Sequence, residues 1–301
     1  METKYRNIPI EELQIIKEIE KNAEKAIYVE INEENHIVEL MSLDCGVKRL
    51  PNEIGKLNLL KSLSISEKDL QELPTTLGNL KSLEELSIFE SKIEEIPISI
   101  KNLENLKTLL LCKSKLKSLP VGVCNLNNLI KIDLNTNNIE TLPECFSKII
   151  KLEYLILDNN NLIKLPESFN KLNQLKKLEL FNNKLTVFSE EMCKLSKLYE
   201  LQLGKNQIKF IPESIFFMKE LMQLYINDNL LEDLPDSMIE LRNLDILDLR
   251  GNNFKEVPEI IFQMDWLESI DLSGNKIKDF PNKIGNMELK ENGHYEDPEL
   301  F

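Results

Sequence analysis

The side chains most often used in catalysis are scarce in this chain. Histidine occurs only at His36 and His294, near opposite ends of the sequence. If the chain is elongated, these residues are too far apart for a Ser-His-Asp or Cys-His arrangement to form. The sequence also lacks the phosphate-binding pattern G-x-x-x-x-G-K-[ST] and the dinucleotide-binding pattern G-x-G-x-x-G. We therefore expect no enzymatic activity and no bound cofactor.

The cysteines do not form a recognisable metal-binding or disulfide pattern. No two of them have C-x-x-C spacing, which excludes the usual zinc sites. Secreted repeat proteins often have close cysteine pairs at both ends, and such pairs are absent here. We interpret all five as free thiols in a reducing compartment and expect a cytoplasmic protein. They are Cys45, Cys112, Cys124, Cys145 and Cys193.

One pair of carboxylates stands at matching places in the sequence. Asp248 and Asp271 should lie on neighbouring strands with Cα atoms about 5 Å apart. Such a pair can hold calcium or a basic side chain. Arg250 lies two residues along the same face and can neutralise the pair. We favour a solvated acidic patch over a calcium site.

Charge and hydrophobicity exclude two classes of partner. The formal net charge is -14 and the sequence pI is about 4.9, so the chain would repel nucleic acid. The N-terminus runs directly into a charged helical pattern without an export signal. No later apolar run approaches the roughly 18 residues that span a bilayer. We expect neither nucleic-acid binding nor membrane insertion.

The elements that would position these side chains are set by an internal repeat. The pattern L-x-x-L-x-L-x-x-N-x-L-x-x-L-P-x-x-I-x-x-L-x-x recurs eleven times from residue 37 to residue 289, with a 23-residue period and without insertion or deletion. We number repeat positions from the first leucine of this pattern. The repeats begin at Ile37, Leu60, Leu83, Leu106, Leu129, Leu152, Leu175, Leu198, Leu221, Leu244 and Leu267.

Each repeat contains two hydrophobic periods. The segment 152–157 alternates with period two and predicts a short strand. The segment 165–172 spaces apolar residues by three and four after Pro166, which predicts a helical or 3₁₀ turn. No single repeat buries both apolar edges, so stacking in parallel makes the core. We predict an α/β solenoid shaped like a horseshoe, with strands on the concave face and short helical segments on the convex face.

Position nine is asparagine in seven of the repeats. A column of amides can satisfy buried backbone groups where each strand turns into its return loop. The first four repeats break this column, and we expect the N-terminal third to be less regular or less stable. The asparagines are Asn137, Asn160, Asn183, Asn206, Asn229, Asn252 and Asn275, and the interruptions are Cys45, Lys68, Ser91 and Ser114.

Both ends of the chain lie outside the repeat. Residues 1–36 have the pattern of an amphipathic helix followed by a strand, and we expect a cap over the open core. Residues 290–301 form a short acidic tail. Either Tyr295, Leu300 and Phe301 fold over the last repeat, or this tail is disordered.

The L-P-x-x-I-x-x-L segments at 50–57 and 73–80 resemble those of intracellular leucine-rich-repeat proteins of the Ras-suppressor and scribble type. They are also similar to uncharacterised microbial proteins built from the same unit. The resemblance covers about 250 residues. It implies a leucine-rich-repeat fold that binds other proteins, often small GTPases or signalling enzymes, through its concave strand face. No partner-binding residue can be carried over, because those positions vary within the family.

Positions three, five and seven of each strand should point away from the core. Most are polar, but several are apolar, which indicates a binding site. We place its centre at Tyr154, Ile156 and Phe181, with Lys131 and Lys177 flanking Tyr154 to pair with an acidic partner segment. Phe89 with Leu110 would form a second contact, and Tyr225 an outlying one.

These observations predict a monomeric, non-enzymatic scaffold that binds a protein partner on its concave face in intracellular signalling. The alternative is a host-directed or cell-surface protein of a microbe, released by a route that the sequence does not show.

Overall fold

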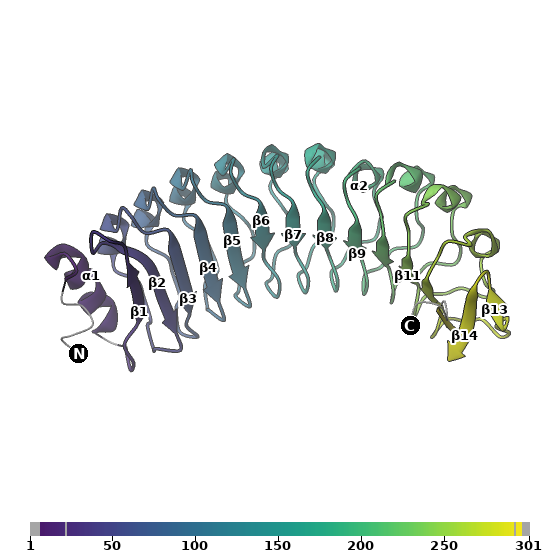
Figure 1. Ribbon diagram of the computed structural model, residues 1–301, viewed down its shortest axis with the longest axis horizontal. Coiled ribbons are helices and arrows are strands. Elements are labelled where there is room, and N and C mark those ends of the chain that lie inside the picture. The colour runs from purple at the N-terminus through teal and green to yellow at the C-terminus, as the bar shows by residue number, and fades with distance from the viewer. Residues whose placement is uncertain (1–6, 22, 292, 297–301) are drawn as a thin grey trace. The chain divides into compact units, whose positions relative to one another are not determined.

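The computed structural model describes residues 7–21, 23–291 and 293–296. It divides into two compact units, Met1–Leu152 and Glu153–Phe301, which we call the N-terminal and the C-terminal unit. Each unit is a stack of repeats in which a strand leads into a short helical return segment (Figure 1). The predicted leucine-rich-repeat solenoid is confirmed for the arrangement of strands and return segments.

The N-terminal unit begins with a helix and an antiparallel strand pair. Helix α1 (Ile10–Glu20) precedes β1 (Tyr28–Ile31), which pairs antiparallel with β2. The following strands pair in parallel, and their Cα partners occupy the same position in successive repeats. These strands are β2 (Ile37–Leu43), β3 (Ser62–Ser66), β4 (Glu85–Phe89), β5 (Thr108–Cys112) and β6 (Lys131–Asp133). The 3₁₀ helices are η1 (Asn52–Lys56), η2 (Thr75–Asn79), η3 (Ile98–Asn102), η4 (Val121–Asn125) and η5 (Glu144–Lys148).

The C-terminal unit continues the same alternation of parallel strands and return segments. Its parallel strands are β7 (Tyr154–Ile156), β8 (Lys177–Glu179), β9 (Glu200–Gln202), β10 (Gln223–Tyr225), β11 (Ile246–Asp248) and β12 (Ser269–Asp271). Its return segments are η6 (Glu167–Lys171), α2 (Glu190–Cys193), η7 (Glu213–Phe217), η8 (Asp236–Glu240) and η9 (Glu259–Gln263).

One return segment is α-helical because its first residue differs. Each 3₁₀ helix follows a proline, which fixes the backbone at the start of the turn, for example Pro166 before η6. Ser189 takes that place before α2, and its hydroxyl accepts a hydrogen bond from the backbone N–H of Met192. This side-chain cap is typical of an α-helix start.

The core is a set of leucine and isoleucine rows that run from strand to strand. The predicted row at position four is confirmed, since its members pair with one another across the sheet and are fully buried. In the N-terminal unit it contains Leu63, Leu86, Leu109 and Ile132, and in the C-terminal unit Leu155, Leu178, Leu201, Leu224, Leu247 and Ile270.

The asparagines at position nine bridge successive repeats. The Asn183 amide nitrogen donates to the carbonyl oxygens of Leu157 at 3.0 Å and Leu180 at 3.2 Å. Its amide oxygen accepts from the backbone N–H of Leu162 at 2.9 Å. Asn206, Asn229 and Asn252 repeat these bonds one strand further on. Each amide thus satisfies backbone groups of two repeats, as the sequence predicted.

The first four repeats lack this asparagine, yet their strands are the longest. Strand β2 has seven residues and β3 to β5 have five each, whereas β6 to β12 have three each. The N-terminal third therefore has longer strands than the other repeats, and its expected lower regularity or stability stays a prediction. In β3 to β5 the parallel pairing extends over two residues more than in the later repeats.

A buried carboxylate replaces the missing amide at the second repeat. Glu67, only 2% exposed, accepts from the backbone N–H groups of Cys45 and Gly46 at 2.9 Å and of Val47 at 3.2 Å. The Ser42 hydroxyl also donates to it. Lys68, at the asparagine position, is exposed.

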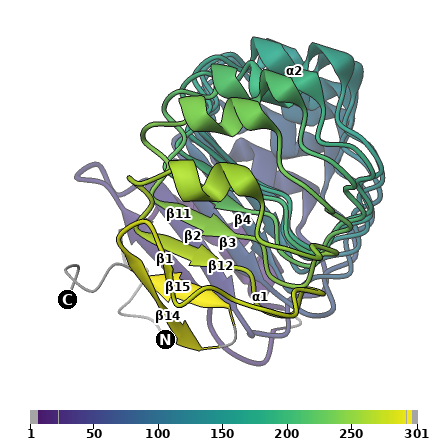
Figure 2. The ribbon, with the colours of Figure 1, turned by 90° about the vertical axis from the view of Figure 1, so that its right-hand side faces the viewer.

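The C-terminal unit ends in an antiparallel extension of its sheet. Strand β13 (Lys283–Ile284) pairs with β14 (Met287–Glu291), β14 pairs with β15 (His294–Glu296), and β15 pairs antiparallel with β12. Figure 2 shows β12, β15 and β14 side by side. The predicted start of the tail at residue 290 falls inside β14. The backbone of Tyr295 pairs with Ile270, while Leu300 and Phe301 lie outside the described residues.

The prediction of five free thiols is wrong for two of them. Cys124 of η4 and Cys145 of η5 form a disulfide with Cα atoms 5.7 Å apart. Their sequence separation is 21, slightly less than one repeat, so they face one another diagonally between successive return segments. Cys45, Cys112 and Cys193 are free and buried.

Candidate functional site

The strand face of the C-terminal unit contains most of the predicted contact residues. We define this face as repeat positions three, five, seven and eight of the repeats of β7 to β12. Tyr154 and Ile156 lie on β7 opposite Lys177 and Glu179 of β8, and Phe181 follows β8 two residues later. All five side chains are half-buried. The strand register is therefore compatible with the prediction that Tyr154, Ile156 and Phe181 lie close together.

The remaining predicted residues lie elsewhere. Phe89 ends β4, and Leu110 on β5 pairs with Ser87, so the two apolar side chains are on adjacent strands of the N-terminal unit. Lys131 is on β6 of the same unit, opposite Thr108. Its expected position beside Tyr154 stays a prediction. Phe89, Leu110 and Lys131 are half-buried.

The Phe181 ring lies against a glycine of the next repeat. A Cβ atom placed on Gly204 would be 2.9 Å from Cδ2 of Phe181 and 2.4 Å from Oδ1 of Asn227, closer than real Cβ contacts. The absence of a side chain at Gly204 therefore makes room for the ring. The Lys205 ammonium lies 5.2 Å from the ring centroid, within the range of a cation–π interaction.

Lys177 is enclosed by carboxylates of its own unit. Its Nζ atom lies 2.7 Å from Glu179 and 3.0 Å from Glu200. Burial opposes its charge, but the hydrogen bonds and attraction of these two carboxylates outweigh burial and raise the lysine pKa above its usual range. An acidic partner would have to displace both carboxylates to reach Lys177. The structure thus argues against the acidic partner segment that we predicted here.

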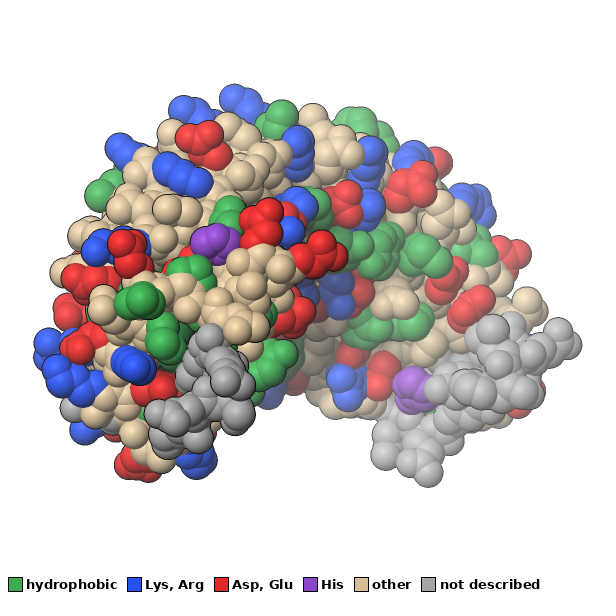
Figure 3. Space-filling model, turned by 60° about the vertical axis from the view of Figure 1, so that its left-hand side comes forward, with side chains coloured by type: hydrophobic (Ala, Val, Ile, Leu, Met, Phe, Trp, Pro, Cys, Tyr) green, Lys and Arg blue, Asp and Glu red, His purple; other side chains and the backbone are tan. Residues whose placement is uncertain are grey.

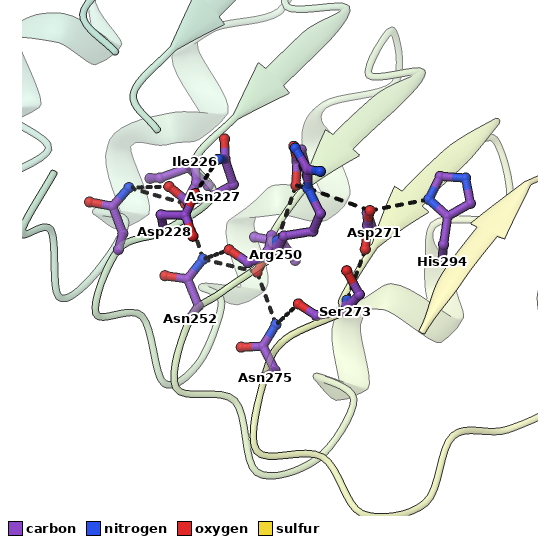
Figure 4. A network of polar contacts seen from close by, with 12 residues as sticks. Ile226, Asn227, Asp228, Arg250, Asn252, Asp271, Ser273, Asn275 and His294 are labelled. Atoms are coloured by element: carbon purple, nitrogen blue, oxygen red, sulfur yellow. Dashed lines mark hydrogen bonds and ion pairs between the residues drawn. The ribbon is translucent and has the colours of Figure 1, made fainter. Parts of the chain in front are cut away.

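The aspartate pair is bridged by Arg250, as one of the sequence alternatives predicted, and Figure 4 shows Arg250 beside Asp271. Nη2 of Arg250 lies 2.8 Å from Asp248 and its Nε lies 3.5 Å from Asp271. The hydrogen bond to Asp248 raises the pKa of Arg250, with attraction from the same carboxylate as the next cause. His294 Nδ1 lies 3.3 Å from Asp271. Within residues 7–21, 23–291 and 293–296, no group of three or more His, Cys, Asp or Glu side chains is suited to a metal ion.

Tyr225 lies among hydrogen-bond acceptors. Its hydroxyl donates to Gln223 Oε1 at 3.2 Å, and its Cα partner on β11 is Asp248. Burial raises the tyrosine pKa, and the negative charges of Glu200 and Asp248 raise it further. The ring is half-buried. Tyr225 therefore offers a partly open aromatic surface in a negative field.

Sequence reasoning missed the residues that surround the aromatic side chains. Glu179, Glu200, Gly204 and Lys205 decide which charges and surfaces are open beside Phe181 and Lys177. The sequence contained one signal for this arrangement. Gly204 is the only glycine at position seven of any repeat, and Phe181 occupies the same position in the preceding repeat.

Outside the strand face, charged side chains pair between successive repeats in both units. Lysines pair with carboxylates at the same position of the preceding repeat, as in Lys92–Asp69, Lys107–Glu84 and Lys117–Glu94. In the view of Figure 3, acidic and basic side chains lie side by side over much of the surface, and hydrophobic side chains gather between them. This pattern is typical of a solvated surface, and such exposed pairs contribute little stability.

Family models for leucine-rich repeats match three parts of the chain. The model of the leucine-rich repeat region matches residues 98–206, and two leucine-rich-repeat models match residues 196–254 and 266–287. A search of curated proteins finds no match. No helix in the described part of the chain is long and apolar enough to cross a membrane.

Solved structures show the same fold. A leucine-rich-repeat protein of Leptospira interrogans is 29% identical with a TM-score of 0.61, and the match covers 81% of this chain and 74% of that one. The plant peptide hormone receptor RGFR1, solved in complex with RGF2, is 30% identical with a TM-score of 0.65. A TDR receptor is 26% identical with a TM-score of 0.68.

The two receptor matches are partial. They cover 75% and 79% of this chain but only 42% and 43% of the receptor chains. The family models and the strand-and-turn architecture agree over most of the sequence. The chain is a leucine-rich-repeat protein.

Proposed function

We propose that this protein is a non-enzymatic interaction module that binds a protein partner on the strand face of its C-terminal unit. The observation that carries the proposal is the Phe181 ring, which a glycine allows to lie across the next repeat on a mostly polar face. Tyr154 and Ile156 on β7 supply further half-buried apolar surface nearby. Aromatic side chains on a polar surface often act as contact centres.

The comparison with the plant receptor supports a protein or peptide ligand. That receptor was solved in complex with RGF2, and it shares the repeat fold over three quarters of this chain. We propose Phe89 with Leu110 as a second contact and Tyr225 as an outlying one. The same proposal includes a small GTPase or a signalling enzyme as the partner. It also includes membership of the Ras-suppressor and scribble group and a monomeric state.

The test is partner capture by the Tyr154→Ala and Phe181→Ala double variant. We expect the double variant to lose the partners that the unaltered protein captures from extracts of its source organism. Its melting temperature should stay nearly unchanged, because neither side chain belongs to the buried rows. The partners would be identified by mass spectrometry.

The control is a matched pair of apolar residues outside the face. Val187 and Phe210 are 51% and 59% exposed in the same unit, and Val187→Ala with Phe210→Ala should retain the partners. Retention by the Tyr154 and Phe181 variant, or its unfolding, would refute the choice of face.

The disulfide favours a second candidate function, that of a microbial cell-surface or host-directed protein. Disulfides persist mainly in oxidising compartments, whereas cytosolic thiols are kept reduced. The Cys124–Cys145 pair therefore supports a location outside the cytosol over the cytoplasmic location proposed from sequence.

Thiol trapping in intact cells separates the two locations. Cells are quenched in acid, the protein is unfolded, and its free thiols are modified with a maleimide that adds mass. Modification of three cysteines supports the second candidate, because three are free in the structure. Modification of all five would show a reduced protein and support the cytoplasmic location.

A further inference from the structure

The disulfide occupies a contact that recurs between successive return segments. In this contact, position 19 of one repeat faces position 17 of the next, and different residues meet there at different junctions. At the junction of η2 and η3, a Cβ atom on Gly78 would collide with the backbone of the next repeat. Between η6 and α2, the Asn170 amide donates to Glu191. Cys124 and Cys145 meet in the same way and are bonded. The fold therefore closes this contact elsewhere without a covalent bond.

The two bonded cysteines differ in their access to solvent. Cys124 is only 3% exposed, whereas Cys145 is half-buried. The Sγ atom of Cys145 lies 3.9 Å from the carbonyl oxygen of Val121, a residue that is 62% exposed. The rate of thiol–disulfide exchange depends on access to the sulfur that is attacked. An external thiol therefore reaches Cys145 more readily than Cys124.

The surroundings of the bond also suit the reduced form. A thiol at Cys145 can donate to the Val121 carbonyl oxygen, which already lies close to its sulfur. A reduced Cys124 behaves as a small apolar side chain, and free cysteines are often buried. Cys112 and Cys193 are free and buried in this chain. Opening the bond at neutral pH therefore places no charge in the core.

We propose that Cys124–Cys145 is an exchangeable disulfide and that Cys145 is the site where a small-molecule thiol attaches. The thiolate of that molecule attacks Sγ of Cys145 and forms a mixed disulfide, while Cys124 leaves as a thiolate and takes up a proton. A second thiolate attacks the sulfur of the attached molecule, and Cys145 leaves and takes up a proton in turn. The two small thiols become one disulfide, and the protein disulfide gains their two electrons.

The first test asks whether the bond opens in the folded protein. The purified protein is incubated with reduced glutathione, quenched in acid and unfolded, and its thiols are counted by mass after modification with a maleimide. We expect the count to rise from three to five, and oxidised glutathione should return it to three. A count that stays at three until denaturant is added would overturn the proposal.

Two single variants identify the sulfur that exchanges. Cys124→Ser leaves Cys145 as the exchangeable thiol, and Cys145→Ser is the matched control because both variants keep the same three buried cysteines. With oxidised glutathione we expect one glutathione on Cys145 in the first variant, added at least about tenfold faster than any glutathione on Cys124 in the second. Peptide mapping locates the addition. Equal rates, or faster addition to Cys124, would refute the assignment of Cys145.

Melting of the reduced protein separates an exchangeable bond from one that the fold requires. We expect the reduced protein to keep its far-ultraviolet circular dichroism spectrum and to melt about 5 to 10 °C lower. The double variant Cys124→Ser, Cys145→Ser should melt at one temperature with or without glutathione. Loss of the native spectrum on reduction would overturn the proposal, and so would an equal shift in the double variant. The site lies on return segments of the N-terminal unit, so these results do not depend on the strand face proposed for the partner.

Discussion

The repeats of β2 to β5 and those of β6 to β12 end their strands in different ways. In the second group the position-nine amide takes the carbonyl oxygen that directly follows the strand. Leu157, for example, follows β7 and accepts from Asn160 and Asn183, both at 3.0 Å. The first group has no such amide, and its strands have five or seven residues instead of three. The shorter strands therefore coincide with the presence of an asparagine at position nine of the same repeat.

The first group also shows two other ways to form hydrogen bonds between repeats at the turn that follows the strand. Glu67 accepts three backbone N–H bonds from the preceding repeat, a task that the asparagine oxygen performs with a single bond elsewhere. Ser91 and Ser114 hydrogen bond to one another at 2.7 Å, so they form a shorter bridge between two repeats. The difference teaches that the fold needs a polar partner at this corner but not a particular residue.

The largest effect is expected at Glu67. Glu67→Ala leaves three buried N–H groups without their acceptor and should lower the free energy of unfolding by about 3 kcal/mol or more. Lys68→Ala, next to it at the asparagine position, should change it by less than about 0.5 kcal/mol because the side chain is exposed. Urea unfolding of both variants measures the difference. Similar values would show that Glu67 does not replace the amide.

A smaller effect is expected when the two groups of repeats are compared directly. Asn183→Ala removes bonds to Leu157, Leu180 and Leu162 and should cost about 2 kcal/mol, whereas Ser91→Ala should cost about 1 kcal/mol or less. Chemical denaturation of the two variants provides the comparison. Equal midpoints at equal slopes would contradict the role given to the amide column.

The smallest effect concerns pH and one buried thiol in the C-terminal unit. Burial raises the pKa of Cys193 to about 11. The folded state keeps the proton longer than the unfolded state, whose thiol ionises near about 8.5. Its contribution to stability is therefore complete below about pH 8.5 and is lost as the pH rises through about 11.

Cys193→Ala tests this sign. Between pH 8 and pH 9.5 the variant should lose about 1 kcal/mol less unfolding free energy than the unaltered protein, as measured by urea unfolding. Burial also raises the pKa of Cys112 in the N-terminal unit, so Cys112→Ala should act in the same direction. A steeper alkaline loss in either variant would contradict the assignment.

Contacts between identical repeat positions could be predicted from the sequence, and diagonal contacts could not. The buried row that includes Leu86 follows from the repeat period alone. The Cys124–Cys145 pair joins position 19 of one repeat to position 17 of the next. A Cβ on Gly55, also at position 19, would lie 2.4 Å from the carbonyl oxygen of Thr76, at position 17. The repeat period shows which repeats are neighbours, but it does not show which positions of two neighbouring repeats are in contact.

The candidate site was predicted in part for a related reason. The positions of Tyr154 and Phe181 on the strand face follow from the strand pleat. The partners of Lys177 depend on how a long side chain chooses between carboxylates on its own strand and on the next. Such choices depend on rotamers and local burial, which the repeat pattern does not determine. The sequence therefore indicated where these side chains lie on the strands, but not which carboxylates Lys177 contacts.

The antiparallel strands at the two ends limit how this protein can change in length. Strand β1 runs opposite to β2, and β15 runs opposite to β12. A new repeat joined beyond either end would meet a strand of the wrong direction, so it could not continue the parallel register. Duplication of one whole repeat inside the array keeps every repeat beside a neighbour of the same direction. The gene for such a protein can therefore lengthen from within while both of its ends stay as they are.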